Sequence, residues 1–309
     1  MNTSGKQDCR MLESQRKSMG DAIMAGKFAT SWALVKASAA VLRSDRELLV
    51  FPLLSGMATL LVAASFALPF LTTGGLAHLH DVTARSGGGF GVAGYALLFL
   101  FYLCQYTVIF FFNTALVGAA MMRLDGDNPT LADGLRLAWS RLPAILGYAL
   151  IAATVGMLLR ALEQRAGLIG RWVIGLLGVA WTVATFLVVP ILAATDLGPA
   201  EAVKESAKLL RRTWGENLIG NAGISMAFGV LFAAIALLGG AMFLASGSHS
   251  LAVNEVVAAV FVLAFILLGL IQSALQGIYS AALYRYATVG SAGNGFEATT
   301  LAQAFRVKA

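Results

Sequence analysis

Long apolar runs separated by short polar segments make up most of this 309-residue chain. Six intervals free of formal charge each reach the roughly 18 residues that a helix needs to cross a bilayer. Their apolar residues do not alternate with polar ones as in the strands of a membrane barrel, so they predict helices. With Gly, Pro and polar ends trimmed, the predicted spans are residues 48–71, 92–119, 143–159, 172–194, 218–245 and 256–283.

Shorter amphipathic segments precede three of these spans. Their apolar residues recur at steps of four and three, which places them on one face of a helix. Such stripes with basic flanks are typical of helices that lie in the membrane interface. The stripes are Phe28, Trp32, Val35, Ala39 and Leu42; Leu131, Leu135, Ala138 and Leu142; and Val203, Ala207, Leu210 and Trp214.

The first and last stripes also resemble one another. A shift of 168 residues places residues 36–43 on residues 204–211 with five identities in eight positions. One interpretation is a three-fold internal repeat, each unit an amphipathic helix followed by two spans. The other is that any short helix beside a membrane is amphipathic, and that identities arise by chance in an Ala- and Leu-rich chain.

Composition and charge agree with a membrane location. Only 12% of the residues are charged, against about 25% in soluble domains, which excludes an ordinary soluble protein. On the six-span topology, 18 Lys and Arg residues fall on one side and 4 on the other. The positive-inside rule then predicts that both termini lie in the cytoplasm. The membrane that the chain spans is expected to be the cytoplasmic membrane. The expected organisation is a polar tail at 1–27, a membrane domain at 28–285 and a cytoplasmic tail at 286–309.

One loop departs from this charge rule. Arg160, Arg165 and Arg171 follow the third span on the side opposite the other basic residues. The third span is also the shortest, so a re-entrant or tilted segment is the rival topology. The net charge of +6 is explained by loops facing anionic lipid and requires no nucleic acid partner.

Polar residues inside the spans provide few candidate sites. No span has a carboxylate or an imidazole in its middle, which argues against proton coupling. Gln272, Gln276 and Tyr279 share one helical face and could line a polar cavity, or serve as ordinary hydrogen-bonding partners between helices. A row of small residues on the same helix predicts close packing on the fifth span. The residues are Gly269, Ser273, Gly277 and Ala281, facing Asn221, Ser225, Gly229 and Ala233.

Histidines offer the remaining candidate ligands. The residues His78, His80, Asp81 and His249 all fall on the non-cytoplasmic side and could bind zinc or copper. Polar loop residues outside a membrane are the plainer interpretation, and we expect no metal and no other cofactor. Cys9 and Cys104 lie in different environments, so no disulfide is predicted.

No catalytic pattern is found in the sequence. Metalloprotease, nucleophile-elbow and phosphate-loop motifs are all absent, which indicates that the protein is not an enzyme. The acidic residues Asp125, Asp127 and Asp133 could hold a cation. The segment 127–130 is better explained as a turn and a helix cap before the next amphipathic helix.

Two resemblances add a family context. The stretch Trp32–Gly56, which contains LVKASAAVLRSDRELLVFPLLSG, resembles the opening of a family of prokaryotic integral membrane proteins of unknown function. A weaker similarity joins Val189–Pro190, Gly198–Pro199 and the segment up to Arg211 to the membrane domain found beside some glycerophosphodiester phosphodiesterases. The first resemblance implies an integral membrane fold without a mechanism, and the second implies a link to lipids.

The sequence therefore predicts an all-α, multi-pass bundle of six transmembrane helices with short amphipathic cytoplasmic helices. We expect a non-enzymatic membrane binding or scaffold protein that engages lipid or a partner protein. The alternative is a transporter or channel for a neutral or lipid-like solute. The pattern indicates no particular oligomeric state.

Overall fold

A computed structural model describes residues 36–72, 92–212, 217–245 and 251–290, and within these ranges the chain is helical without any strand. Helical residues 36–44 come first. The elements that follow are η1 (Arg46–Leu49), α2 (Val50–Thr72), α4 (Val92–Asp125), α5 (Leu131–Ser140), α6 (Leu142–Arg165), α7 (Leu168–Ala184), α8 (Val188–Ala194), α9 (Pro199–Arg212), α10 (Asn217–Ala245) and α11 (Leu251–Val289).

Five segments within the described residues are long and apolar enough to cross a membrane. They are Arg46–Leu68, Gly94–Asp125, Leu142–Arg165, Ile169–Ala194 and Asn254–Val289. The predicted fifth span coincides with α10, a helix of 29 residues. Its described apolar stretch, Phe228–Met242, is shorter than a full span. Six spans therefore stay a prediction, and α11 continues past the domain boundary expected at residue 285.

The third predicted span, 143–159, was too short. α6 continues through Arg160 and Glu163 to Arg165, which gives it 24 residues. The prediction stopped at the first charged residue, whereas helical hydrogen bonding continues into the region where long basic side chains can reach polar surroundings. The length argument for a re-entrant third segment is thereby removed.

The fourth predicted span, 172–194, is interrupted. α7 ends at Ala184 and α8 begins at Val188, with a turn of three residues between them. Pro190 explains the interruption, because it lacks the N–H that a continuous helix would donate to Phe186, and its ring would contact that carbonyl. Apolar composition alone predicted one straight helix.

The end of α4 has a well-defined stop signal. Gly126 adopts a positive φ of 100°, a conformation that glycine reaches without a steric penalty. Its N–H bonds Arg123 O at 3.1 Å, and the next N–H, of Asp127, bonds Met122 O at 3.1 Å. This Schellman arrangement satisfies the last carbonyls and turns the chain into α5.

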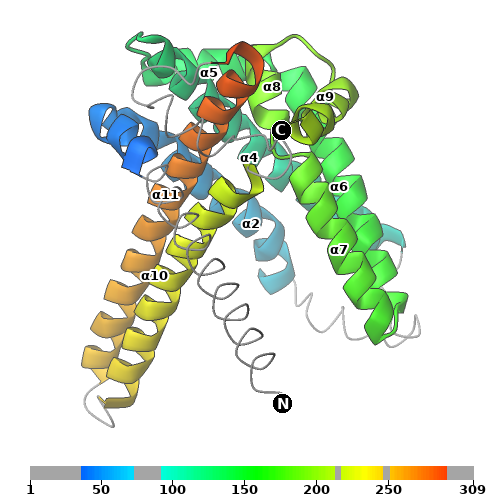
Figure 1. Ribbon diagram of the computed structural model, residues 1–309. Coiled ribbons are helices and arrows are strands. Elements are labelled where there is room, and N and C mark those ends of the chain that lie inside the picture. Colours follow the sequence, from blue (N-terminus) through cyan, green and yellow to red (C-terminus); the bar gives the residue numbers. More distant parts are fainter. Residues whose placement is uncertain (1–35, 73–91, 213–216, 246–250, 291–309) are drawn as a thin grey trace, which may run out of the picture.

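The buried core lies at one end of the molecule. It combines the C-terminal halves of α4 and α11 with η1, the start of α6, α8 and α9, while the α6–α7 and α10–α11 hairpins diverge from that end (Figure 1). The largest fully buried side chains are Tyr279, Phe51, Leu48, Leu116, Leu124, Ile145, Leu187, Ile191, Leu192 and Ile278.

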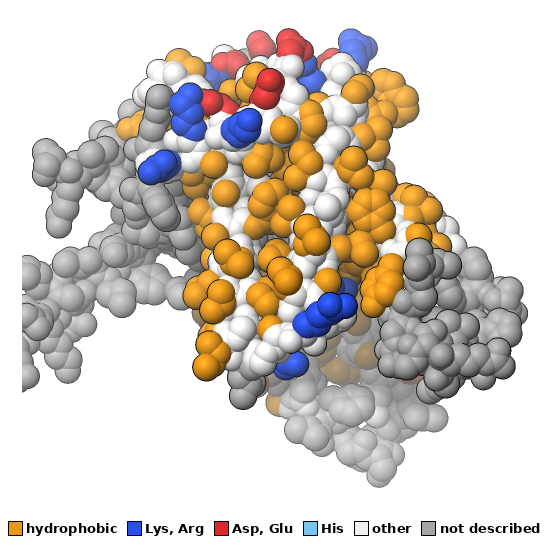
Figure 2. Space-filling view, turned by 90° about the vertical axis from the view of Figure 1, so that its right-hand side faces the viewer, with side chains coloured by type: hydrophobic (Ala, Val, Ile, Leu, Met, Phe, Trp, Pro, Cys, Tyr) orange, Lys and Arg blue, Asp and Glu red, His pale blue; other side chains and the backbone are white. Residues whose placement is uncertain are grey.

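Away from this core, large apolar side chains cover the outside of the helices. Figure 2 shows such a band over the face of the α6–α7 hairpin, below a rim of charged side chains. Burial of this much apolar surface is what a lipid environment provides. Exposed residues on α7 and α10 include Ile169, Trp172, Leu176, Leu177, Val230, Leu237 and Leu238.

Candidate functional site

Charged side chains and short amphipathic helices gather at the packed end of the bundle. There α5 and α9 lie beside the C-terminal ends of α4, α8 and α11 (Figure 1). Close approach is possible because small residues lie at the contacts. A Cβ on Gly134 of α5 would meet Ala115 O of α4 at 2.9 Å, and one on Gly147 of α6 would meet Pro199 at 2.6 Å.

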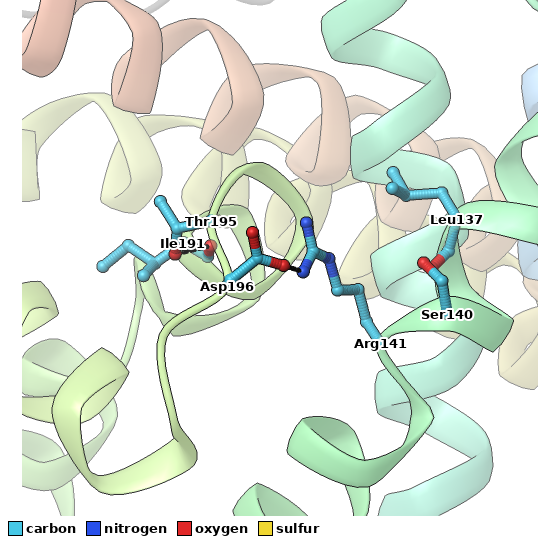
Figure 3. A network of polar contacts seen from close by, with 6 residues as sticks. All are labelled: Leu137, Ser140, Arg141, Ile191, Thr195 and Asp196. Carbon is cyan, nitrogen blue, oxygen red and sulfur yellow. Dashed lines mark hydrogen bonds and ion pairs between the residues drawn. The ribbon is translucent and has the colours of Figure 1, made fainter.

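One ion pair joins the α5–α6 junction to the end of α8. Arg141, between the two helices, donates to the Asp196 carboxylate just after α8 (Figure 3). The Arg141 side chain is 22% exposed and that of Asp196 is 91% exposed. Thr195 beside it donates to Ile191 O at 2.7 Å, which closes the end of α8. Solvent screens this pair, so its main effect is on geometry.

A second ion pair joins α11 to the end of α4. Arg285 donates to the Asp125 carboxylate and to Met121 O, the latter at 3.5 Å. Asp125 and Asp196 hold corresponding places, each at the end of a second apolar helix and shortly before an amphipathic one. Their basic partners come from different helices, so the pairs tie separate parts of the chain together.

Ser206 of α9 repairs the interruption between α7 and α8. Its hydroxyl donates to Ala184 O at 2.7 Å and accepts from Leu187 N at 3.1 Å, and the residue is fully buried. These are backbone groups that the turn leaves without helical partners. Unpaired buried amides are costly, so one side chain from the amphipathic helix α9 stabilises a break in an apolar helix.

The acidic segment after α4 forms a helix cap, as predicted. Thr130 Oγ1 accepts from Asp133 N at 3.3 Å, and Asp133 accepts from Thr130 N at 3.0 Å, a reciprocal capping box. Hydrogen bonds from the Thr130 side chain and backbone lower the pKa of the Asp133 carboxyl. Arg123 donates to Asn128 in the same turn.

The predicted polar face of α11 does not converge on one site. Gln276 donates to Ser225 of α10 at 3.3 Å, a bond between neighbouring helices. Tyr279 is fully buried and its ring lies 6.5 Å from that of Phe186 at the α7–α8 turn. Gln272 lies a turn earlier on α11 and is half-buried. These contacts fit the packing interpretation better than a polar cavity.

One member of the small-residue row on α11, Gly277, lies close to α4. A Cβ on Gly277 would lie 2.5 Å from Leu116 Cδ2 of α4, whereas Gly269, and Gly229 on α10, have no described neighbouring atom within 4 Å of such a Cβ. Ala281 is fully buried and Ser273 is half-buried. α10 and α11 do pack together, through Phe232 and Phe265 stacked at 5.4 Å.

Sequence reasoning missed an aromatic ladder along α4. Tyr102, Tyr106 and Phe110 stack in succession with centroids 6.2 and 5.7 Å apart, and Phe110 lies 4.5 Å from Tyr148 of α6. Their spacing of four residues was the available signal. At the far end, Arg160 of α6 donates to the Tyr102 hydroxyl.

The candidate metal ligands His78, His80, Asp81 and His249 lie outside the described residues, as does Cys9. Within the described part of the chain, no three His, Cys, Asp or Glu side chains gather as a metal site. Cys104 is free and half-buried. At the charged end of the molecule, the ion pairs Arg141–Asp196 and Arg285–Asp125 join groups of the protein to one another. Their effect is to hold helices in place.

The architecture is that of an all-helical protein with several apolar helices of membrane-spanning length. The chain belongs to a family of unknown function, DUF6159, whose sequence model matches residues 92–296. That match begins after Trp32–Gly56, the stretch that carried the family resemblance in the sequence. No curated protein matches the chain, and the similarity to membrane domains beside phosphodiesterases has no support.

Proposed function

We propose that this protein is a multi-pass protein of the cytoplasmic membrane with six spans and both termini in the cytoplasm. The uninterrupted helix of α10, uncharged over all 29 residues, supports the fifth predicted span and so a total of six. Two exposed tryptophans support the positions of the two membrane boundaries. Trp139 on α5 lies at the charged end of the molecule, and Trp172 lies in the first turns of α7, at the other end of the α6–α7 hairpin. Such rings are typical of the membrane–water interface.

We also propose the three-fold repeat. The shift that aligns the first and last stripes places Ser38 on Ser206, and both are fully buried. α5 and α9 share a cap geometry, because Glu201 accepts from Gly198 N just as Asp133 accepts from Thr130 N. Counting from these caps, Ala138 of α5 takes the place of Ser206 and is also fully buried.

The role that the architecture supports best is non-enzymatic binding of membrane lipid. The carrying observation is the uneven burial: one end is a packed core, while the two hairpins diverge and expose apolar side chains. Because the diverging helices do not cover one another, acyl chains can occupy the space beside them. A partner membrane protein would be the other occupant of the same surface.

The test is native mass spectrometry of the protein extracted gently from its own membrane. We expect phospholipid retained in a fixed stoichiometry, and a higher Tm when lipid is added back to stripped protein. A bare chain whose Tm does not respond to lipid would contradict lipid binding. Retention of a second protein in its place would favour the scaffold role.

The interruption between α7 and α8 favours a second candidate, a transporter or channel for a neutral or lipid-like solute. Broken helices line the substrate sites of many transporters because they free backbone groups for a ligand. Here Ser206 bonds two of those groups, which weakens the case. Solute flux in proteoliposomes above that of protein-free liposomes would favour the transporter.

A further inference from the structure

Three arginines lie at the end of the α6–α7 hairpin that points away from the packed core. α6 begins among buried residues at Ile145 and Tyr148 and continues for 24 residues, about 36 Å, to Arg165. Arg160 lies just before that end, and Arg171 lies in the first turns of α7. Figure 2 shows basic side chains at the lower end of this face, beneath the apolar band.

Their position is unfavourable unless something compensates. On the proposed topology these arginines face the non-cytoplasmic side, where the positive-inside rule disfavours basic residues. Glu163 is the acidic residue within the described part of this hairpin, and it forms no ion pair there. Within the described residues, Arg165 and Arg171 are exposed and form no ion pair either. In the described part of the chain, the hairpin end thus holds three arginines and one carboxylate, with no ion pair among them.

Arg160 is held in place by α4. Its guanidinium carbon lies 5.7 Å from the centroid of the Tyr102 ring, and a terminal nitrogen donates to the Tyr102 hydroxyl. Arg160 is exposed, and a guanidinium has further N–H groups beyond the one that donates to Tyr102. The contact fixes one basic group at the α4–α6 boundary, five residues before Arg165 on the same helix.

Apolar side chains surround the basic ones. Ile169 is 82% exposed and Trp172 is 78% exposed, and both are on the first turns of α7 with Arg171. Leu158 and Leu162 are exposed on α6 near Arg160. A free anion in water would gain nothing from such neighbours, whereas a lipid has a charged headgroup and acyl chains that match both kinds of surface.

We propose that this end of the α6–α7 hairpin binds the phosphate of anionic phospholipid headgroups, with the acyl chains against the exposed apolar side chains of α6 and α7. The inference rests on the proposed lipid-binding function and names its lipid class and place. Guanidinium groups pair with phosphate oxygens through charge-assisted hydrogen bonds, which are stronger than neutral ones. Arg165 and Arg171 supply the free donors, and Arg160 adds a fixed positive charge.

The test compares lipid preference in the full-length protein. Purified protein is exchanged into detergent with equal amounts of phosphatidylglycerol and phosphatidylcholine of the same acyl chains, and bound lipid is counted by native mass spectrometry. We expect the wild type to retain phosphatidylglycerol preferentially. In the Arg165→Gln/Arg171→Gln double variant that preference should fall about tenfold, since charge-assisted hydrogen bonds are lost. Arg160 is left intact to preserve its contact with Tyr102.

A matched control removes the same charge elsewhere. Lys204→Gln/Lys208→Gln, on α9 at the charged end, should keep the preference. Equal Tm values for both double variants exclude misfolding as the cause of a loss. The preference for phosphatidylglycerol would be expected to survive millimolar inorganic phosphate, because phosphate lacks acyl chains.

Three results would overturn the proposal. They are a wild type without preference between the two lipids, a double variant that keeps its preference, or displacement of the lipid by inorganic phosphate alone. In each of these three results the protein still binds lipid, so the proposed lipid-binding function would not be contradicted. A wild type that retains no lipid of either class would contradict both the site and the function.

Discussion

At the scale of single residues, two buried serines differ in whether their hydroxyl group stabilises the fold. Ser206 and Ser38 are both fully buried, but only Ser206 bonds the backbone at the α7–α8 turn; among the described residues the Ser38 hydroxyl has no hydrogen-bond partner. We expect Ser206→Ala to lower the free energy of unfolding by about 1–3 kcal/mol, because Leu187 N is left buried and unpaired. Thermal unfolding in detergent measures the effect.

Ser38→Ala is the matched control for this change. Both substitutions remove one buried hydroxyl from corresponding positions of the proposed repeat, yet Ser38→Ala breaks no hydrogen bond to any residue that the structure describes. Its Tm should equal or exceed that of the wild type, since an unpaired polar group is removed. Equal losses from both substitutions would show that the hydrogen bonds of Ser206 contribute nothing specific.

Glycines on α11 give a second residue-scale prediction. Gly277→Leu forces side-chain atoms into Leu116 of α4 and should destabilise the protein by about 1–3 kcal/mol, the usual effect of overpacking. Gly269→Leu, two turns earlier on the same helix, adds the same side chain into open space. The comparison is made by melting both variants in one detergent, and equal Tm values for the two would contradict the packing described.

These glycines also show which part of the helix packing could be predicted from the sequence. The four-residue spacing predicted a row of small residues that lets another helix approach α11 closely, and Gly277 of that row lies against Leu116 of α4. It could not indicate the partner, because a row of small residues describes one helix surface, whereas the helix that fills it is set by the tertiary arrangement. Gly277 therefore faces α4, and Gln276 bonds Ser225 of α10.

At the scale of elements, the sequence predicted the long apolar helices and the helix cap before α5. It did not predict the interruption between α7 and α8. The cap before α5 follows from local residue types, since Thr130 and Asp133 satisfy one another's backbone groups. The turn between α7 and α8 depends on Pro190 together with Ser206, which is distant in sequence and supplies the compensating bonds. From the position of a proline alone, one cannot tell whether a helix will be kinked or will be broken into two helices that a third helix stabilises.

The α5 cap predicts a dependence of stability on pH. Hydrogen bonds from Thr130 lower the pKa of Asp133 in the folded protein below its ordinary value of 3.8. The stabilisation is thus complete above the unfolded pKa and is lost as the pH falls through the lower folded pKa. Asp133→Asn should lower the Tm at neutral pH, and the difference from wild type should shrink below pH 3.8.

Thr130→Val provides the control for that experiment. It removes the side-chain hydrogen bond to Asp133 but leaves the carboxylate and its charge in place. The Asp133 carboxyl should then titrate closer to its ordinary pKa, which carboxyl carbon NMR can follow. An unchanged titration midpoint in Thr130→Val would contradict the assignment of the lowered pKa to this threonine.

At the scale of the whole molecule, hydrophobicity predicted the helical class but not the shape. The six intervals each correspond to a described helix, and the fourth corresponds to two, because backbone groups in apolar surroundings must bond within the segment. That the core would gather at one end could not be read from the same intervals, since lipid-facing and protein-facing residues are equally apolar. Leu116 is fully buried and Leu237 is 74% exposed, although both lie in uncharged apolar runs.

The proposed topology makes a prediction about the whole chain. In a variant with Cys9 and Cys104 replaced by serine, single cysteines placed at Asp127, Gly167 or Leu197 should be labelled by a membrane-impermeant maleimide from different sides. Asp127 and Leu197 follow the ends of α4 and α8, and Gly167 joins α6 to α7. In intact cells only the cysteine at Gly167 should react; after the cells are opened, all three should. Because α6 has 24 residues, it is long enough to carry the chain across. Protection of the cysteine at Gly167 in intact cells would restore the re-entrant third segment, and it would also place the three arginines of the α6–α7 hairpin on the cytoplasmic side.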